Sequence, residues 1–315
     1  MPVLKEVDIV FPLRAVRQAD SPARRKKGKR KQRTVPMQLI YVKRRCAMLV
    51  VGEKINTSRK AVKEAVANKD ASFIRNLARQ QAEGGAHYID INCGTFIDTE
   101  RELMTWLVEE VQKELDLPLC IDSPDPRAVA AGLKAHKNGQ PMINSISGEK
   151  ERYNAILPLV KEYGAKIVVL CMDDEVGIPH DADTRFKIAR WVIDGLLEIG
   201  TKDDDIYVDP LIQPISTDTK NGLSALETIK MVKEAYPGTH AVCGLSNVSF
   251  GLPERKLLNQ TFMVMLMAAG LDGVILDPND KRMMALISAG EALLDRDPYC
   301  GQYLKAYRKG ILSQG

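Results

Sequence analysis

The 315-residue sequence lacks long apolar segments: no stretch approaches the roughly 18 consecutive apolar residues of a membrane-spanning helix, and no apolar run at the N-terminus ends in a small-residue cleavage site. Only four histidines are present, and the six cysteines lie far apart without a C-x-x-C pair. Neither a disulfide framework nor a close-spaced zinc motif is therefore indicated. We expect a cytosolic protein with reduced, mostly buried thiols. The 45% of hydrophobic residues predict a sizeable core, formed by one large domain or two small ones.

Motifs for phosphate binding and nucleophilic catalysis are also missing. Neither G-x-G-x-x-G nor G-x-x-x-x-G-K-[ST] occurs, and the turn after the first predicted strand reads GEKIN at 52–56, so nucleotide binding has no support. G-x-S-x-G is absent, and Cys93 has no histidine placed to activate it. The histidines fall outside the predicted catalytic positions, and we interpret them as structural: His87, His136, His180 and His240.

The charge of the chain is unevenly distributed. Residues 1–47 carry 14 Lys and Arg against three acids, whereas residues 48–315 carry 31 basic and 38 acidic side chains. The run RRKKGKRKQR at 24–33 has no apolar periodicity, which is typical of a solvated segment. We interpret 1–47 as a disordered basic extension, or as upstream sequence added by a start codon placed too early, with Met48 as the start. The functional alternative is an arm that binds nucleic acid or an acidic partner through counterion release.

From residue 48 onward, short apolar segments rich in β-branched residues alternate with longer amphipathic segments. The helical pattern is clear at 100–115 and 184–199, where apolar residues recur at steps of three and four. Strands that are apolar throughout are typical of a parallel sheet covered by helices. The predicted strands are 48–52, 87–92, 119–122, 142–145, 167–172, 206–209, 241–245 and 273–277. Eight repeats in about 250 residues predict a single α/β domain, a (β/α)8 TIM barrel over 48–315.

Polar side chains follow nearly every predicted strand, at the end where such barrels place their reactive groups. Asp and Asn also cap helices and form turns there, so each of them has a structural alternative. The set is Glu53, Asn56, Asp90, Asn92, Asp122, Ser123, Asn144, Ser145, Asp173, Asp209, Ser246, Asn247 and Asp277. With almost no Lys, Arg or His among them, they predict a pocket for an uncharged heterocycle, because carboxylates accept from N–H groups and carboxamides donate and accept. No metal is assigned, although oxygen ligands leave a magnesium site open.

Around these residues the sequence resembles the pterin-binding barrel family, and within it the methyltetrahydrofolate:corrinoid-protein methyltransferases, which are related to the folate module of methionine synthase. The segment around Asn247 is the most specific, because it separates the methyltransferases from the pterin-condensing dihydropteroate synthases. The matching segments are VGEKIN (51–56), RQQAEGGAHYIDIN (79–92), LCIDS (119–123), MINSIS (142–147), GIPHDADTR (177–185), YVDPLIQP (207–214), CGLSNVSFGLPER (243–255) and LLNQTFMVMLMAAGLDG (257–273).

The resemblance implies roles for individual residues. Asp122, Asn144 and Asp209 would hydrogen-bond the pterin ring, with Asp209 accepting from the 2-amino group and N3. Asn247 would lie close to N5. Further contacts implied at the same cavity or its mouth are those of Asp90, Asn92, Gln213 and Arg255.

The implied reaction is methyl transfer between N5 of tetrahydrofolate and the cobalt of a corrinoid protein, in a direction that the sequence leaves open. A tertiary amine is a poor methyl donor, so N5 must gain positive character as the methyl leaves; we assign this task to Asn247, with Asp122 acting through a water. The D-x-H-x-x-G motif of one corrinoid-binding module is absent, so cobalamin is expected on a partner corrinoid protein. The resemblance also suggests a homodimer. A pterin-condensing synthase is the alternative, but residues 276–280 supply acids where its pyrophosphate leaving group would require cations.

Overall fold

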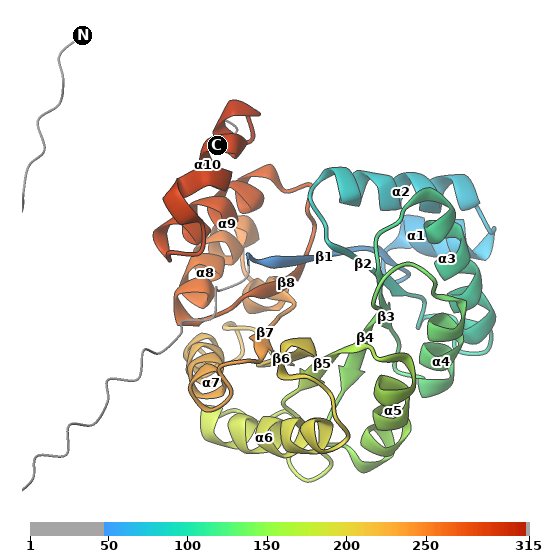
Figure 1. Cartoon of the computed structure of the whole chain (residues 1–315), viewed down its shortest axis with the longest axis horizontal. Coiled ribbons are helices and arrows are strands. Elements are labelled where there is room, and N and C mark those ends of the chain that lie inside the picture. Colours follow the sequence, from blue (N-terminus) through green and yellow to red (C-terminus); the bar gives the residue numbers. More distant parts are fainter. Residues whose placement is uncertain (1–46, 313–315) are drawn as a thin grey trace, which may run out of the picture. The chain divides into compact units, whose positions relative to one another are not determined.

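The computed structural model describes residues 47–312, in which eight parallel strands close into a barrel surrounded by helices (Figure 1). Hydrogen-bonded neighbours run in the order β7-β6-β5-β4-β3-β2-β1-β8. A parallel bridge between Gly244 and Ile275 joins the chain after β7 to β8, where the Ile275 N–H donates to the carbonyl of Cys243 at 2.9 Å. The predicted (β/α)8 barrel is therefore confirmed. The expected basic extension, except Ala47, lies outside the described residues, as does Cys46.

The strands are β1 (Leu49–Asn56), β2 (Tyr88–Asn92), β3 (Leu119–Asp122), β4 (Met142–Ile146), β5 (Lys166–Leu170), β6 (Ile206–Asp209), β7 (His240–Ala241) and β8 (Gly273–Leu276). All eight predicted strands are found, with bounds that differ by a few residues. The largest differences are at β1, which continues four residues beyond its predicted end at 52, and at β7, predicted over 241–245. At β7 the regular strand covers two residues, and after the bridge at Gly244 the chain enters a 3-10 helix, η2 (Leu245–Ser249), which carries Asn247 to the end of the barrel.

The α-helices are α1 (Lys60–Ala67), α2 (Ala71–Glu83), α3 (Glu100–Glu114), α4 (Pro126–Ala135), α5 (Lys150–Tyr163), α6 (Ala182–Glu198), α7 (Asn221–Ala235), α8 (Arg255–Ala269), α9 (Lys281–Leu293) and α10 (Gly301–Arg308), with short 3-10 turns η1 (Asp203–Asp205) and η3 (Pro298–Cys300). Eight barrel helices were expected. The described residues contain ten α-helices, because the first β–α connection is split by the positive φ of Lys69, and α10 follows a second break at Asp295 and Tyr299.

Several helices begin at an aspartate that accepts a hydrogen bond from a backbone N–H of the first turn, a preferred N-cap arrangement. The capping residues are Asp70 for α2, Asp125 for α4, Asp181 for α6 and Asp280 for α9. None of them belongs to the predicted site. Helix capping therefore does not account for the predicted site residues, although some of them form turns, as described below.

The interior of the barrel is filled by one apolar layer, so the barrel is not a pore. Side chains that alternate inward along the strands form this layer: Val51, Tyr88, Cys120, Met142, Val168, Tyr207 and Val242. A second, larger core lies between the strands and the surrounding helices. The apolar layer matters for function because it forms the floor on which any ligand at the C-terminal ends of the strands must rest.

The cysteines and histidines take structural positions. Cys93, Cys120, Cys171 and Cys243 are buried and unpaired, while Cys300 is exposed. His87 Nδ1 accepts from the Val50 N–H at 3.0 Å, and His136 Nε2 accepts from the Leu119 N–H at 3.2 Å, both near strand beginnings. Among residues 47–312, no helix has the length and apolar character needed to cross a membrane.

Candidate functional site

A polar layer lies directly above the apolar floor of the barrel. Because side chains alternate along a strand, the residue two positions after each floor residue points into the barrel mouth. This rule places four predicted site residues in one layer: Asp90 follows Tyr88, Asp122 follows Cys120, Asn144 follows Met142, and Asp209 follows Tyr207. The fold therefore brings these four side chains to a common end of the barrel, as the sequence predicted.

On one side of the mouth, two amide side chains and one carboxylate form a row across neighbouring strands. Asn92 of β2 pairs in register with Asp122 of β3, and Asp122 with Asn144 of β4. The Asn92 Nδ2 group donates to Asp122 Oδ2 at 2.9 Å, while its Oδ1 accepts from the Gly94 N–H at 3.1 Å. These two bonds fix which end of the Asn92 amide faces the acid. Asn92 therefore orients Asp122 within the row.

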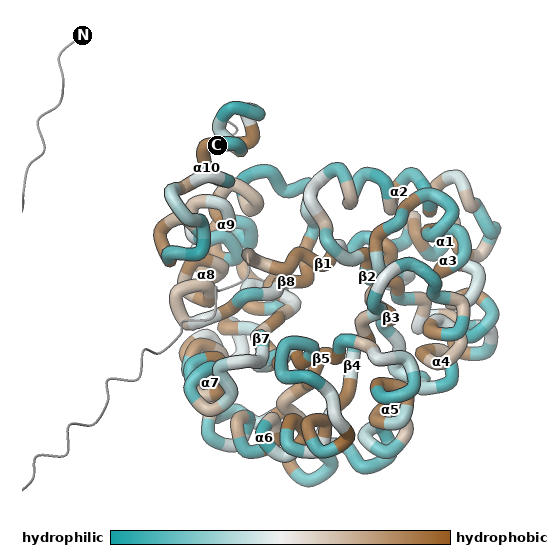
Figure 2. Tube along the Cα trace, viewed as in Figure 1, coloured by the Kyte–Doolittle hydropathy of each residue, from teal (hydrophilic) through white to brown (hydrophobic). Residues whose placement is uncertain are grey.

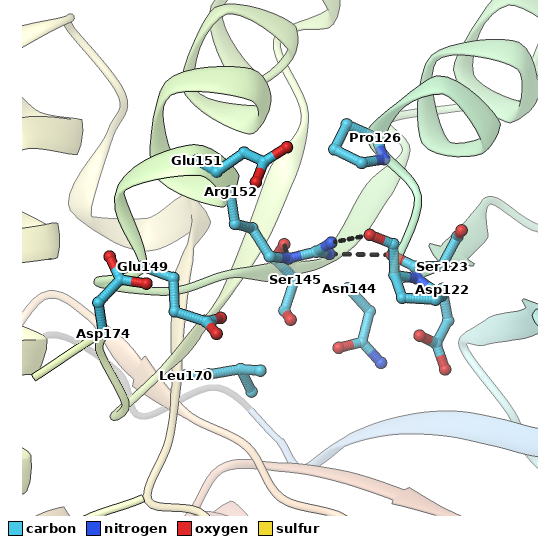
Figure 3. Close-up of a pocket in the computed structure, with 11 residues that line it drawn as sticks. Asp122, Ser123, Pro126, Asn144, Ser145, Glu149, Glu151, Arg152, Leu170 and Asp174 are labelled. Carbon is cyan, nitrogen blue, oxygen red and sulfur yellow. Dashed lines mark hydrogen bonds between the residues drawn. The ribbon is translucent and has the colours of Figure 1, made fainter. Parts of the chain in front are cut away.

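This row opens into a cavity of about 580 Å³. Asp122 and Asn144 line it at the barrel end, and Leu170 of β5 supplies an apolar wall. Figure 3 shows the side chains of Asp122 and Asn144 directed into the same space, with Arg152 of α5 above them. The outer lining also contains acids, namely Glu149, Glu151 and Asp174. Such a volume accommodates a bicyclic heterocycle. Of the predicted site residues, Asp122 and Asn144 line this cavity, whereas Asp209 and Asn247 do not.

Two carboxyl groups in this part of the barrel have raised pKa values. Asp90 is 2% exposed, and its Oδ1 has no hydrogen-bond partner among the described residues. Burial raises the Asp90 pKa well above its usual value, and the charge of Asp122 raises it further. Hydrogen bonds from the side chains of Cys120 and Asn144 act in the opposite direction. Burial also raises the pKa of Asp122 to about 6, although the Asn92 amide and the Arg152 charge act in the opposite direction. Two neighbouring acids that resist simultaneous ionisation are typical of functional sites.

Asp209 occupies the other side of the mouth, at the end of β6. Its Oδ1 accepts from the Leu211 N–H at 2.7 Å. Burial raises its pKa to about 6, whereas the backbone N–H groups of Leu211 and Gly244, and the charge of Arg185, favour the ionised form. Arg185 is itself fully buried, and neither of its terminal nitrogens has a hydrogen-bond partner among the described residues. Arg185 thus supplies a nearby positive charge that the sequence analysis did not identify.

Asn247 lies at the exposed rim, in η2, rather than in the buried layer. Arg255 braces this segment: its Nε donates to Ser249 Oγ at 3.0 Å and its Nη2 donates to the Ser246 carbonyl at 2.7 Å. The loop that contains Gln213 is joined to the same segment, because the Ile215 N–H donates to the Val248 carbonyl at 3.0 Å. Asn247, Gln213 and Arg255 are therefore grouped beside β6 and β7, on the same side of the mouth as Asp209.

Cations do approach the rim, which corrects the expectation that they are nearly absent there. Lys54 Nζ pairs with Asp277 Oδ2 at 2.6 Å. A register shift in β1 between Gly52 and Ile55 interrupts the strand alternation at this point, so simple periodicity did not reveal the position of Lys54. The pair neutralises Asp277, the acid at the end of β8.

Arg152 is a further cation at the rim, and no motif in the sequence predicts it. From the first turn of α5 its guanidinium donates to three backbone carbonyls: Nε to Ser145 at 2.9 Å, Nη1 to Pro124 at 2.8 Å and Nη2 to Ser123 at 2.9 Å. Arg152 thereby ties together the loops that follow β3 and β4, which carry Asp122 and Asn144. Its charge also partly offsets the rise in the Asp122 pKa that burial causes.

Some rim residues act as turn formers, as the structural alternative states. Asn56 Oδ1 accepts from the Ser58 N–H at 2.9 Å. Asp173 Oδ1 accepts from the N–H groups of Glu175 and Val176 at 3.1 and 2.9 Å. In the part of the chain that the structure describes, no group of three or more His, Cys, Asp or Glu is arranged to hold a metal ion.

Comparison with known proteins places the sequence among pterin-dependent proteins. Residues 52–277 match the family model described as pterin binding enzyme. The chain is 38% identical over 264 residues to a methylcorrinoid:tetrahydrofolate methyltransferase of Eubacterium limosum, which covers 84% of this chain and 97% of that protein. It is 30% identical over 243 residues to methionine synthase of Mycobacterium tuberculosis, covering 73% of this chain and 20% of that protein.

The solved structures with a similar fold are more distant in sequence. A dihydropteroate synthase from Clostridium difficile, crystallised with pteroic acid, superposes with a TM-score of 0.63 at 18% identity, over 80% of this chain and 98% of that one. A likeness at this level of identity concerns the fold alone.

Proposed function

The chain belongs to the pterin-binding enzyme family, and from this premise we propose that it is a methyltransferase that moves a methyl group between tetrahydrofolate and a corrinoid protein. The observation that carries this conclusion is the 38% identity to a methylcorrinoid:tetrahydrofolate methyltransferase over 97% of that protein's length. The match runs along nearly the whole relative, which supports a shared activity.

The residues of the barrel mouth fit a reduced pterin. An ionised Asp209 accepts from the 2-amino group and N3–H of the ring, and its remaining bonds to backbone N–H groups hold it in place. Across the mouth, Asp122 and Asn144 contact the other edge of the ring, with Asn92 orienting Asp122. The buried Oδ1 of Asp90 has no hydrogen-bond partner among the described residues, and leaving a buried acceptor unpaired costs free energy. We therefore propose that it accepts from an N–H group of the ligand at the same edge. Gln213 and Arg255 then lie at the outer side of the pocket.

The transfer itself is a displacement at the methyl carbon, with N5 as the attacking atom and cobalt as the leaving atom. We propose the direction that the relative's name gives, in which N5 of tetrahydrofolate attacks the methyl group of the methylcorrinoid. The N5–C bond forms, the Co–C bond breaks with its electron pair left on cobalt, and N5 releases its proton. Asn247 contacts N5 and stabilises its changing charge, since a carboxamide donates to one state and accepts from the other. Asp122, ionised above about pH 6, accepts the proton through a water.

The cobalt belongs to the second substrate. Cobalamin is carried by a partner corrinoid protein that docks over the barrel mouth and presents its methyl group to N5. The chain's own contribution is positioning of the pterin and polarisation of N5. In the methionine synthase relative, this chain corresponds to 20% of the length, in agreement with a folate-binding part that works with a separate cobalamin-binding part.

We propose three further properties. The four buried, unpaired cysteines fit a reducing compartment such as the cytoplasm. The homodimer that the resemblance implies is likewise a proposal. We also propose that residues 48–315 carry the activity by themselves, since the family match begins at residue 52.

The test of the function is a single-turnover assay with a methylated corrinoid protein and tetrahydrofolate. We expect methyltetrahydrofolate to form together with the spectrum of Co(I), and the same rate from a chain that begins at Met48. Retention of the full chain on nucleic acid that decreases with salt, without folate binding, would instead favour the basic-arm alternative. Condensation of a pterin pyrophosphate with p-aminobenzoate would favour the dihydropteroate synthase alternative, which shares the fold at 18% identity.

Folate binding is expected to weaken as the pH falls below about 6. Asp122 and Asp209 both have a pKa raised by burial to about 6, and both must be ionised to accept from the pterin. Protonation therefore removes acceptors, and each required ionisation contributes up to about tenfold in Kd per pH unit below the pKa. Calorimetric titration between pH 5 and 8 should show a constant Kd above pH 7 and a Kd at pH 5 at least about tenfold weaker. Equal affinity across this range would remove both carboxylates from the contact.

A further inference from the structure

Arg152 of α5 connects the two loops that carry the pterin contacts on one side of the mouth. Ser123 directly follows Asp122, and Ser145 directly follows Asn144. Figure 3 shows the Arg152 guanidinium reaching from α5 to the loop at Ser123. Each of its three nitrogens donates to a backbone carbonyl: Nε to Ser145 at 2.9 Å, Nη1 to Pro124 at 2.8 Å and Nη2 to Ser123 at 2.9 Å. One side chain therefore holds the backbone next to both contact residues.

Arg152 brings a positive charge to this edge of the mouth without a direct ion pair among the described residues. Its hydrogen bonds go to uncharged carbonyl groups. Three other cations at the rim are each paired with a carboxylate: Lys54 with Asp277 at 2.6 Å, Arg59 with Glu53 at 2.8 Å and Arg127 with Asp125 at 3.0 Å. The charge of Arg152 therefore acts on its surroundings at longer range, and the acids with which it interacts in this way are Asp122 and Glu149.

Asp122 lies among groups that oppose its ionisation. Burial raises its pKa to about 6, and the charge of Glu100 on α3 acts in the same direction. Asp90 on the neighbouring strand competes with it, because two adjacent carboxyl groups resist simultaneous ionisation. The Asn92 amide and the Arg152 guanidinium favour the ionised form, and of these two groups Arg152 carries the charge. The ionisation of Asp122 therefore depends on Arg152.

The apolar surroundings make this charge effective. Leu170 forms an apolar wall of the cavity, and the strands of the barrel are largely hydrophobic, as the brown segments at β1 and β8 in Figure 2 show. Charges in such surroundings interact more strongly than in water, because the effective dielectric constant is lower. Salt also screens partly buried charges less than exposed ones. Arg152 thus influences Asp122 without a direct ion pair.

We propose that Arg152 is a positioning residue for methyl transfer, which keeps Asp122 charged and holds it in place beside the pterin. The proposal rests on the function proposed above, in which Asp122 accepts the N5 proton. In that step the N5–H bond breaks, a water takes the proton, and the same water passes a proton to the Asp122 carboxylate. A protonated Asp122 cannot accept this proton, so the step requires the charged form. Arg152 acts through Asp122 rather than on the reacting atoms.

Arginine suits both tasks because of the shape of its side chain. The planar guanidinium offers donors in several directions and reaches three carbonyls at once, whereas a lysine ammonium is a point charge on a flexible stem. Arg152→Lys would therefore keep the charge and lose most of these hydrogen bonds. Arg152→Met would lose both while it fills a similar space. The two substitutions separate the effect of the charge from the effect of the loop contacts.

The pH dependence of the single-turnover rate, at saturating tetrahydrofolate, tests the proposal. In the wild-type chain the rate should rise as Asp122 ionises around pH 6. In Arg152→Met the midpoint should move upward by about one pH unit or more, which is the effect that a neighbouring opposite charge has on a carboxyl group. Arg152→Lys should keep the wild-type midpoint and react more slowly at every pH. Arg127→Met, which removes an exposed rim arginine paired with Asp125, is the matched control and should behave as the wild type.

Two further measurements locate the effect at Asp122. With Asp122→Asn the residual rate should no longer rise around pH 6, and adding Arg152→Met should not create a new midpoint, because the coupling between two side chains disappears when one of them is removed. An NMR titration of the Asp122 carboxyl carbon in the ligand-free chain should show the same upward shift in Arg152→Met as the rate does.

An unchanged midpoint in Arg152→Met, or a shift that persists with Asp122→Asn, would overturn the proposal. Equal rates for Arg152→Lys and the wild type would contradict the part assigned to the loop contacts. If Arg152→Met does not fold, Arg152→Gln takes its place, because it removes the charge and keeps an amide donor. The NMR titration requires no reaction. An upward shift in a chain that forms no methyltetrahydrofolate would therefore refute the proposed function and leave the control of Asp122 by Arg152 intact.

Discussion

Replacing Asn247 with alanine is expected to slow methyl transfer on the order of 100-fold, with little change in folate affinity. A single donor that acts on the transition state is worth about 2 to 3 kcal/mol of barrier, and each 1.4 kcal/mol is about tenfold in rate. Asn247 lies at the exposed rim beside β7, so the pterin does not depend on it for burial. Its carboxamide is the group proposed to contact N5, where charge changes during the reaction.

Single-turnover rates with a methylated corrinoid protein, measured alongside the folate Kd, separate these two effects. Ser246→Ala is the matched control, because it changes the neighbouring exposed residue while keeping the backbone carbonyl to which Arg255 donates. We expect the control to react at the wild-type rate. Unchanged turnover in Asn247→Ala, or a loss that appears only in Kd, would contradict the proposed role at N5.

Replacing Asp209 is expected to weaken folate binding. The alanine variant leaves the 2-amino and N3–H donors of the pterin without an acceptor, at a cost of about 1 to 3 kcal/mol, or roughly 5- to 150-fold in Kd. It also removes the acceptor of the Leu211 N–H at 2.7 Å, so the alanine variant changes the loop as well as the pocket. Asp209→Asn keeps an oxygen for that bond and removes only the charge, which makes it the more informative variant.

Calorimetry with tetrahydrofolate should rank the affinities as wild type, then Asp209→Asn, then Asp209→Ala. The asparagine variant should also lose part of the decline in affinity below about pH 6, because one of the two titrating carboxyl groups is gone. Asp173→Ala is the control for a rim acid that only forms a turn, through the N–H groups of Glu175 and Val176. Wild-type affinity in both Asp209 variants would place this residue outside the pocket.

Local pattern was sufficient to predict the barrel, because each strand is a continuous apolar run and each helix an amphipathic one. β3 and β6 were predicted with the observed bounds. The prediction was less accurate at β7, because the apolar residues that follow His240 are compatible both with a longer strand and with the turn into η2. Which conformation that segment adopts depends on its contact with the 211–218 loop, and such a contact is not encoded in periodicity.

The candidate site was predicted in part. Strand alternation alone implies that Asp90, Asp122, Asn144 and Asp209 face the barrel interior, and the structure places them above one apolar layer. Alternation could not reveal Arg152 or Arg185, because both come from helices and reach the site through long side chains. The orientation of each guanidinium group depends on the backbone carbonyls that accept its hydrogen bonds, which are those of Ser123, Pro124, Ser145 and Pro179.

The sequence by itself determined the number and order of the strands, the oxygen-rich character of the barrel mouth and the family, because these follow from side-chain chemistry at fixed spacing along the chain. Only the tertiary structure decided which acids are buried and therefore titrate near pH 6, and which cations approach them. The physical reason is the same in both cases: burial and electrostatic interaction depend on distances between residues far apart in sequence, and those distances exist only once the barrel has closed.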